Sequence, residues 1–333
     1  MPAFAAMKGM RAPARQTRRL PRRRASRPDG PSIDRRAFLA FAAAAAAMPA
    51  YAASEPQGRI VTLPPLDFPD HRPTRVRIWL PPGYDAGTRA YRTLYMLDGQ
   101  LAFAGDFDGE NFAADRRMAG LAAAGRIEST LIVAIDNLED DRFLQYMPQT
   151  IYDQAEPGLR AAVDRELARL AGRPLVSAQF IRFLATRLKP YVDAHYRTSP
   201  DRLDTAIFGA SMAGVMAGAI FVEAQHSFGR GACMSPNWAI YDRRFIDHPQ
   251  LLTLWPDYFA RLGAPDGRRL WLDHGTRMMD AGMAPHQIGI ARRLTELGWQ
   301  PGSNLEARVY QGAGHAFGTT AVQMDELLVW LLA

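Results

Sequence analysis

The chain has 333 residues, with 40 Lys and Arg against 34 Asp and Glu and a single cysteine. Residues 1–52 hold 11 of the basic residues and 2 of the acidic ones, so the formal net charge of +6 comes from this segment and the rest of the chain is slightly acidic. This distribution argues against nucleic acid as a partner. The one cysteine, Cys233, excludes an intramolecular disulfide, and its apolar neighbours Ala232 and Met234 predict a buried small side chain.

Residues 1–52 are typical of an export signal. An arginine-rich region ends in the sequence Asp-Arg-Arg-Ala-Phe-Leu at residues 34–39, and an apolar run follows at residues 41–48. The sequence Ala-Tyr-Ala at residues 50–52 then has the small residues of a cleavage site. This order is similar to a bacterial twin-arginine signal and predicts a periplasmic or secreted protein that is cleaved after Ala52 and uses the export machinery. The apolar run is shorter than the roughly 20 residues that span a bilayer, so we expect no stable membrane span. The alternative is a disordered basic arm followed by an alanine helix.

From residue 53 onward, apolar runs of strand length alternate with helical patterns. The predicted strands are Val76–Leu80, Thr93–Leu97, Leu131–Ile135, Thr205–Phe208, Leu270–Leu272 and Leu305–Tyr310. The predicted helices are Leu159–Leu170, Ser177–His195, Val215–Ala224, Pro285–Leu297 and Thr319–Leu332. This alternation indicates a mostly parallel sheet covered on both faces, and residues 53–333 are expected to form a single α/β domain. The least regular piece, residues 236–268, is either a cap over the sheet or simply part of the core.

A serine lies at the junction of a predicted strand and a predicted helix. The strand Thr205–Phe208 runs directly into Gly-Ala-Ser-Met-Ala-Gly at residues 209–214. Such a corner is typical of a nucleophile elbow, which exposes Ser211 in a tight turn between strand and helix. Ala213 stands at the second glycine position of this motif, and its methyl group is small enough for the corner. The alternative is a small-residue turn that only packs a helix on the sheet.

A serine nucleophile needs a base, and the last predicted strand is followed by one. His315 lies in the glycine-rich sequence Gly-Ala-Gly-His-Ala-Phe at residues 312–317, at the carboxyl end of that strand, where open α/β sheets place their sites. The alternative for His315 is a surface loop histidine. His274 and His286 are the substitute bases.

The base needs an acid, and two carboxylates compete for this role after the strand Leu270–Leu272. Asp280 lies in the loop beyond the strand, from which its side chain can point across the sheet to His315, so it is preferred. Asp273 is still in the strand or at its last residue, and it is the alternative acid.

The oxyanion of an attacked ester needs backbone N–H donors. The residue after the serine, Met212, supplies one. The second is expected from the backbone N–H of Gln100, which follows an early strand in the sequence Leu-Asp-Gly-Gln at residues 97–100. The alternative is that this Asp-Gly pair is an ordinary turn.

Several further segments carry a resemblance over nearly all of residues 53–333. They are Trp79–Tyr84, Tyr95–Gln100, Ile135–Asn137, Arg142, Tyr146–Pro148, Leu188–Val192, Tyr196–Thr198 and Ser235–Trp238. Together with the elbow, they resemble the putative-esterase family of α/β-hydrolases, which includes esterase D, enterochelin esterases, feruloyl esterases and mycolyl transferases. The resemblance implies the α/β-hydrolase fold, Ser211 as nucleophile, His315 as base and an acid in the Gly275–Asp280 loop. Arg142, Tyr146 and Trp238 are then hypothetical substrate contacts.

The sequence therefore predicts an exported serine esterase that cleaves a small-molecule or glycan-linked carboxylic ester through an acyl-enzyme. No HExxH motif, Cys/His cluster or phosphate-binding glycine loop occurs, so neither a metal nor another cofactor is expected. Two alternatives stay open. One is an acyltransferase of the same fold, and the other is a catalytically silent periplasmic protein that only binds its partner.

Overall fold

The computed structural model describes residues 58–66, 72–106, 110–242, 244–245, 248–315 and 317–333. The predicted signal segment, residues 1–52, lies outside them. Residues 56–333 form one compact unit, which is built on an eight-stranded sheet. The strands in spatial order are β1 (Arg59–Thr62), β2 (Val76–Leu80), β4 (Thr130–Ile135), β3 (Arg92–Leu97), β5 (Thr205–Ala210), β6 (Arg230–Met234), β9 (Arg269–Gly275) and β10 (Leu305–Tyr310). A separate antiparallel pair is formed by β7 (Tyr241–Asp242) and β8 (Arg244–Phe245).

Parallel pairing dominates the sheet. Strands β4, β3, β5, β6, β9 and β10 pair in parallel, whereas β2 joins β1 and β4 in antiparallel fashion. Every residue of β2 and β4 is buried, as expected for strands that are covered on both faces. The edge strand β10 instead alternates between more buried and more exposed side chains. The predicted mostly parallel sheet of an α/β fold is therefore confirmed.

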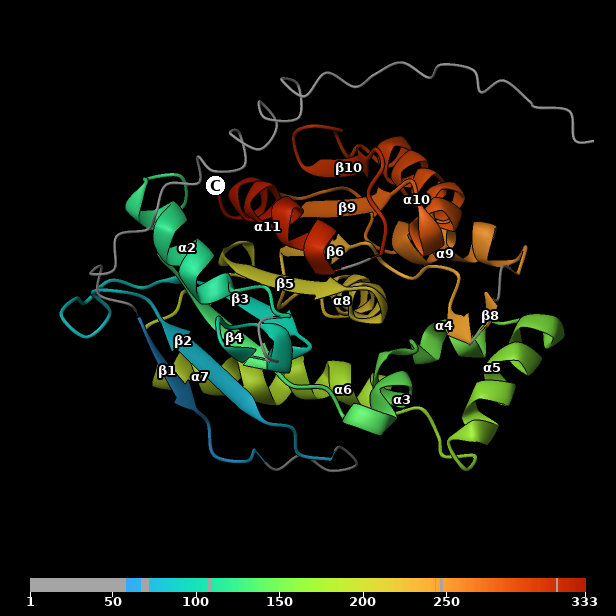
Figure 1. Ribbon diagram of the computed structural model, residues 1–333, viewed down its shortest axis with the longest axis horizontal. Coiled ribbons are helices and arrows are strands. Elements are labelled where there is room, and N and C mark those ends of the chain that lie inside the picture. Colours follow the sequence, from blue (N-terminus) through green and yellow to red (C-terminus); the bar gives the residue numbers. More distant parts are fainter. Residues whose placement is uncertain (1–57, 67–71, 107–109, 243, 246–247, 316) are drawn as a thin grey trace, which may run out of the picture. The chain divides into compact units, whose positions relative to one another are not determined.

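Helices cover both faces of the sheet (Figure 1). The longer helices are α2 (Ala114–Ala123), α5 (Pro157–Arg169), α8 (Met212–Glu223), α9 (Leu251–Ala260), α10 (Ala284–Glu296) and α11 (Phe317–Leu332). The shorter ones are α3 (Arg142–Tyr146), α4 (Gln149–Asp153), α6 (Ser177–Phe183) and α7 (Lys189–His195), the last two joined by a π-helical turn, η4 (Leu184–Leu188). The 3-10 turns are η1 (Gly99–Leu101), η3 (Glu139–Asp141), η5 (Arg202–Asp204) and η6 (Met278–Gly282).

The two faces of the sheet form two separate cores. Alternate residues of one strand point to opposite faces, so Leu94 and Met96 join the core beneath α2 and α11, while Tyr95 and Leu97 join the core that contains α8. All eleven of the α8 residues from Met212 to Val222 are buried, which explains why this helix has no polar stripe in the sequence. Helix α8, which follows the elbow, is therefore packed inside the larger of the two cores.

Strand β6 and helix α2 are among the elements that the sequence did not predict, and the structure decides between the two interpretations of residues 236–268. Strand β6 reads Arg-Gly-Ala-Cys-Met and helix α2 has many alanines, so neither has the strong apolar periodicity on which prediction depends. Residues 236–268 contain α9, and Trp238 and Trp255 are fully buried with ring centroids 5.1 Å apart. These aromatic residues therefore belong to the core.

Within the described ranges, no helix combines the length and the apolar character needed to cross a membrane.

Candidate active site

Ser211 occupies a strained corner between β5 and α8. Its backbone has φ 59° and ψ −126°, a combination that non-glycine residues rarely adopt. A side chain at Gly209 would lie 2.0 Å from the carbonyl oxygen of Ala213, so only glycine allows strand and helix to pass this closely. Ala213 itself is fully buried and is accommodated at the second glycine position. The predicted elbow geometry is therefore present with alanine at this position.

The structure brings Ser211 together with His315 and Asp280. The His315 Nε2 atom lies 2.9 Å from the Ser211 hydroxyl oxygen. The other ring nitrogen, Nδ1, lies 2.7 Å from Asp280 Oδ1. The three side chains come from loops at the carboxyl ends of β5, β9 and β10, three strands of one parallel sheet. They form the serine, histidine and carboxylate arrangement that allows a hydroxyl to become a nucleophile.

The Asp280 carboxylate is buried and fully hydrogen-bonded. Its second oxygen, Oδ2, accepts hydrogen bonds from the Gly275 backbone N–H at 2.9 Å and the Ser235 hydroxyl at 3.0 Å. Burial by itself would raise the pKa of Asp280, but the hydrogen bonds from His315, Gly275 and Ser235 outweigh it and hold the pKa below its ordinary value. Asp280 is therefore ionised at neutral pH and holds the proton of His315 on Nδ1.

Asp273, the alternative acid, has a different set of partners. It has no exposed surface, and its oxygens accept hydrogen bonds from the Ser235 backbone N–H at 2.8 Å and from Trp271 Nε1 at 2.7 Å. Burial raises the pKa of Asp273 to about 7. Its bonded partners anchor the turn after β6 to strand β9, and neither is the histidine.

The two substitute bases lie in the interior. The exposed fraction is 3% for His274, on β9, and 0% for His286, on α10. Burial lowers the pKa of His274. Among the described side chains, the hydrogen-bond partner of Ser211 Oγ is His315.

The two predicted oxyanion donors follow the ends of two neighbouring strands, β3 and β5. Met212 is the first residue of α8, where the backbone N–H groups have no acceptor within the helix. Gln100 lies in η1, immediately beyond β3, and β3 pairs in parallel with β5 so that Met96 lies beside Phe208. Beyond this pair, β3 ends at Leu97 and β5 ends at Ala210. The Gln100 loop and the elbow therefore leave the sheet side by side.

Tyr146 and Trp238, expected to contact the substrate, do not reach the surface. Both side chains have 0% exposure. The Tyr146 hydroxyl accepts a hydrogen bond from the Asp98 backbone N–H at 3.1 Å. The Trp238 carbonyl accepts a hydrogen bond from Trp255 Nε1 at 2.7 Å. The assignment of these two residues as substrate contacts is therefore corrected, because a fully buried ring has no surface to offer a ligand.

Arg142 is tied to the loop of residues 98–100, which is called the oxyanion loop below because it carries the predicted donor Gln100. Its guanidinium donates to both carboxylate oxygens of Asp98, at 2.6 to 3.2 Å. Asn137 also donates to Asp98, at 2.7 Å, while its backbone N–H donates to the Gln100 side chain at 3.2 Å. The positive charge of Arg142 is therefore already paired with Asp98, and the role of Arg142 in this structure is to hold the loop after β3.

The roles of two polar residues near this site, Ser235 and Arg77, were not predicted from the sequence. Ser235 supports Asp280 and is itself held in a left-handed conformation, with φ 39°. Arg77 is buried in β2 and donates to the carbonyl oxygen of Gly99. A lone arginine within the apolar strand Val-Arg-Ile-Trp-Leu was a signal that could have been noticed, because charge is rarely buried without a partner.

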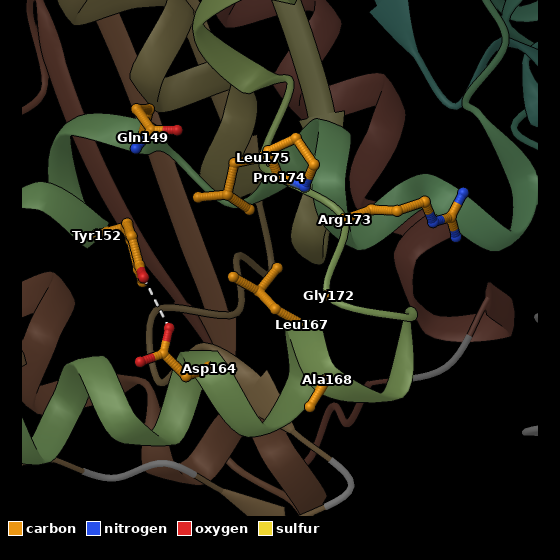
Figure 2. Close-up of a pocket in the computed structure, with 9 residues that line it drawn as sticks. All are labelled: Gln149, Tyr152, Asp164, Leu167, Ala168, Gly172, Arg173, Pro174 and Leu175. Carbon is orange, nitrogen blue, oxygen red and sulfur yellow. Dashed lines mark hydrogen bonds between the residues drawn. The ribbon is translucent and has the colours of Figure 1, made fainter.

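A separate cavity of about 410 Å³ lies between α4, α5 and the segment that leads into α6 (Figure 2). Leu167 and Leu175 point into it, Tyr152 donates a hydrogen bond to Asp164 at its edge, and Arg173 points away. None of its lining residues belongs to the Ser211 site.

In the described part of the chain, no group of three or more His, Cys, Asp or Glu residues is arranged to hold a metal ion.

The sheet topology and the elbow together define an α/β-hydrolase. Residues 71–315 match the family model described as "Putative esterase". Because this match covers most of the chain, the chain belongs to that family and the protein is an esterase. Comparison with curated proteins finds no match.

Solved structures of esterases share the fold. A ferulic acid esterase has 18% sequence identity and a TM-score of 0.57, over 83% of this chain and 98% of that one. The enterobactin esterase of Shigella flexneri, solved in the presence of enterobactin, has 16% identity and a TM-score of 0.59 over 84% of this chain. The match spans 59% of the Shigella chain. A ferulic acid esterase from the anaerobic fungus Anaeromyces mucronatus has 18% identity and a TM-score of 0.56, over 85% of this chain and 92% of that one.

Proposed function

We propose that this esterase is an exported serine hydrolase that cleaves a carboxylic ester through an acyl-enzyme on Ser211. One observation carries the proposal: a single imidazole, His315, lies 2.9 Å from the Ser211 hydroxyl and 2.7 Å from a buried carboxylate. An unactivated hydroxyl is a weak nucleophile, and this arrangement supplies both the base and the group that orients it.

The proton transfers follow from this geometry. Ionised Asp280 accepts the Nδ1 hydrogen of His315, which leaves the lone pair on Nε2 directed at Ser211. As Ser211 Oγ bonds to the ester carbonyl carbon, Nε2 takes its proton, and the carbonyl π electrons move onto oxygen. The tetrahedral intermediate then expels the alcohol, which receives the proton from Nε2. Water repeats the sequence on the acyl-enzyme and releases the acid and free Ser211.

The carbonyl oxygen becomes negatively charged in both steps. The proposed donors are the backbone N–H groups of Met212, at the start of α8, and Gln100, in η1. Donors that are already oriented before the reaction stabilise this charge without reorganisation, and one such donor contributes about 10²- to 10³-fold to the rate. The adjacency of β3 and β5 supports this pairing.

The substrate is proposed to be a small-molecule or glycan-linked ester. Ferulic acid esterases and an enterobactin esterase share this fold, so cinnamoyl esters, catechol-siderophore lactones and short-chain acyl esters form the test panel. Similarity of fold alone supports the choice of this panel.

Hydrolysis of short-chain p-nitrophenyl esters by the protein and by Ser211→Ala tests the mechanism. We expect the wild-type rate to fall by about 10³-fold or more in the variant, since the remaining site offers only binding and oxyanion donors. Activity that is independent of Ser211 would contradict the proposal. Faster transfer to an added alcohol than to water would instead assign the acyltransferase alternative.

Export is supported by the order of features in residues 1–52, which lie outside the described residues. The Arg35-Arg36 pair precedes an apolar run and a small-residue cleavage pattern. Replacing both arginines by lysine is expected to abolish periplasmic accumulation in cell fractions. The control replaces Arg22 and Arg23, in the same basic region, by lysine. Equal export of both variants would contradict the twin-arginine assignment.

A further inference from the structure

A charged side chain is buried in strand β2, near the carboxyl end of the neighbouring β-strands. Arg77 is 8% exposed and lies in a strand whose other residues are all apolar. Burying a charge is costly unless the charge is paired and hydrogen-bonded. Asp106 provides that pairing, with two hydrogen bonds of 2.9 Å to the guanidinium. The ion pair makes the burial possible, but it does not explain why an arginine is needed here.

A further hydrogen bond joins Arg77 to the oxyanion loop. Its Nη2 atom donates to the carbonyl oxygen of Gly99 at 2.6 Å, and the same oxygen accepts the backbone N–H of Ala102 at 3.0 Å. Because the peptide unit is planar and trans, its N–H points away from its C=O. The carbonyl of Gly99 and the N–H of Gln100 belong to one peptide. Fixing the Gly99 carbonyl therefore also fixes the direction of the Gln100 N–H.

This peptide is confined on its other sides as well. A side chain at Gly99 would lie 2.4 Å from the backbone nitrogen of Ile135, so the loop lies directly against β4. Asp98, the preceding residue, has a left-handed backbone with φ 52°, and its N–H donates to the Tyr146 hydroxyl. The peptide before Gln100 is thus held by β2, β4 and α3 at the strand end that adjoins the elbow.

We propose that Arg77 is a positioning residue for the oxyanion hole, an inference that rests on the proposed serine mechanism. The guanidinium holds the Gly99 carbonyl and directs the Gln100 N–H toward the reacting oxygen. Its positive charge also polarises the peptide, which makes that N–H a stronger donor. Asp106 neutralises the guanidinium, and Asp136 lies 3.9 Å from Nη2, so the effect is local to the peptide that Arg77 touches.

The test compares Arg77→Met, which keeps much of the side-chain volume, with Arg77→Lys, which keeps the charge and a donor. The control is Arg268→Met, because Arg268 is 3% exposed and donates to the Leu262 and Ala264 carbonyls at 2.6 Å, at the opposite end of β9. Active sites are counted by titration. Two quantities are then measured: kcat/KM for a p-nitrophenyl ester, and the inhibition constant of a trifluoromethyl ketone with the same acyl group.

We expect Arg77→Met to lower kcat/KM by about 10- to 100-fold, less than loss of the donor itself. The trifluoromethyl ketone forms a tetrahedral adduct with an oxyanion, so its inhibition constant is expected to rise by the same factor, with KM little changed. Arg77→Lys is expected to show a smaller loss in both quantities. Arg268→Met is expected to reduce stability but leave both constants per active site unchanged.

A structural role alone would reduce the number of active sites without changing the inhibition constant, and that result for Arg77→Met would overturn the proposal. If Arg77→Met does not fold, Arg77→Lys is decisive: unchanged inhibition by the ketone would overturn the proposal. Failure of the serine mechanism is a different result, because the wild-type protein would then neither depend on Ser211 nor bind the ketone.

Discussion

Two loops at the same end of the sheet each present a buried aspartate, yet the two carboxylates have different partners. Asp98, after β3, is 6% exposed and binds the guanidinium of Arg142. Asp280, after β9, is 1% exposed and binds the imidazole of His315. Each carboxylate also accepts hydrogen bonds from neutral donors in its own neighbourhood.

The partner decides what each carboxylate can do. A guanidinium stays charged throughout the accessible pH range, so the Asp98 pair can fix a loop but cannot transfer a proton. An imidazole gains and loses a proton near neutral pH, so the Asp280 pair can take part in catalysis. We therefore expect disruption of the Asp98–Arg142 pair and disruption of the Asp280–His315 pair to change activity by very different amounts and in different ways.

Replacing Asp280, the carboxylate that is paired with His315, gives the largest expected effect. Asp280→Asn retains the shape of the side chain but favours the wrong tautomer of His315, so kcat should fall by about 10³- to 10⁴-fold with KM little changed. Steady-state hydrolysis of a p-nitrophenyl ester measures kcat and KM, and thermal unfolding shows whether the variant folds. A decrease in kcat of less than tenfold would mean that another residue is the acid of the site.

Breaking the other pair should mainly affect the loop. Arg142→Ala leaves Asp98 buried without its cation, which costs about 3–5 kcal/mol in the free energy of unfolding. We expect kcat to fall by about tenfold on acidic and neutral esters alike, because the Gln100 donor is displaced. Rates on a matched pair of esters measure this. A loss confined to acidic esters, seen in KM, would restore Arg142 as a substrate contact.

Removing one neutral donor from Asp280 should have a smaller effect. Ser235→Ala deletes the hydroxyl that lies 3.0 Å from Oδ2 and leaves the Gly275 N–H in place. A carboxylate with fewer donors binds a proton more readily, so the pKa of Asp280 should rise, and the acid limb of the activity profile, which reports the hydrogen-bonded Asp280–His315 pair as a unit, should move to higher pH. The dependence of kcat/KM on pH tests this. A lower rate at every pH, with an unshifted acid limb, would contradict it.

The smallest effect on activity is expected from Asp273→Asn, which instead changes how stability depends on pH. The pKa of Asp273 is about 7 in the folded protein, against about 3.9 when unfolded. The folded state therefore binds more protons between these values, so this group makes stability fall as pH rises from about 4 to 7, by up to about 4 kcal/mol. Urea unfolding at several pH values should show a flatter dependence in the variant. An identical slope, or a large loss of kcat, would contradict this account.

The elbow and the histidine loop could be read from the sequence because each is a local motif. The residues 209–214 of the elbow are consecutive, and His315 follows directly after the last strand. The preference for Asp280 over Asp273 depended only on which residue lies beyond the strand end. The structure places Asp280 next to the histidine, and Asp273 within β9.

The roles of Arg142 and Tyr146 depend on contacts between distant parts of the chain. The Arg142 pair joins residues 44 positions apart, and the Tyr146 hydroxyl bonds to a backbone group 48 positions away. Burial of Trp238 likewise depends on α9, which the sequence did not reveal. A motif indicates that a residue lies near a site, but only packing decides whether it faces the substrate or supports the loop behind it.

Trapping of the acyl-enzyme distinguishes a covalent mechanism on Ser211 from any other. The protein is mixed with excess p-nitrophenyl ester, quenched with acid within the first turnover, and analysed by intact mass and peptide mapping. We expect one acyl group per chain, on the peptide that contains Ser211, and none in Ser211→Ala. Acylation of another residue, or turnover by a protein that never carries an acyl group, would contradict it.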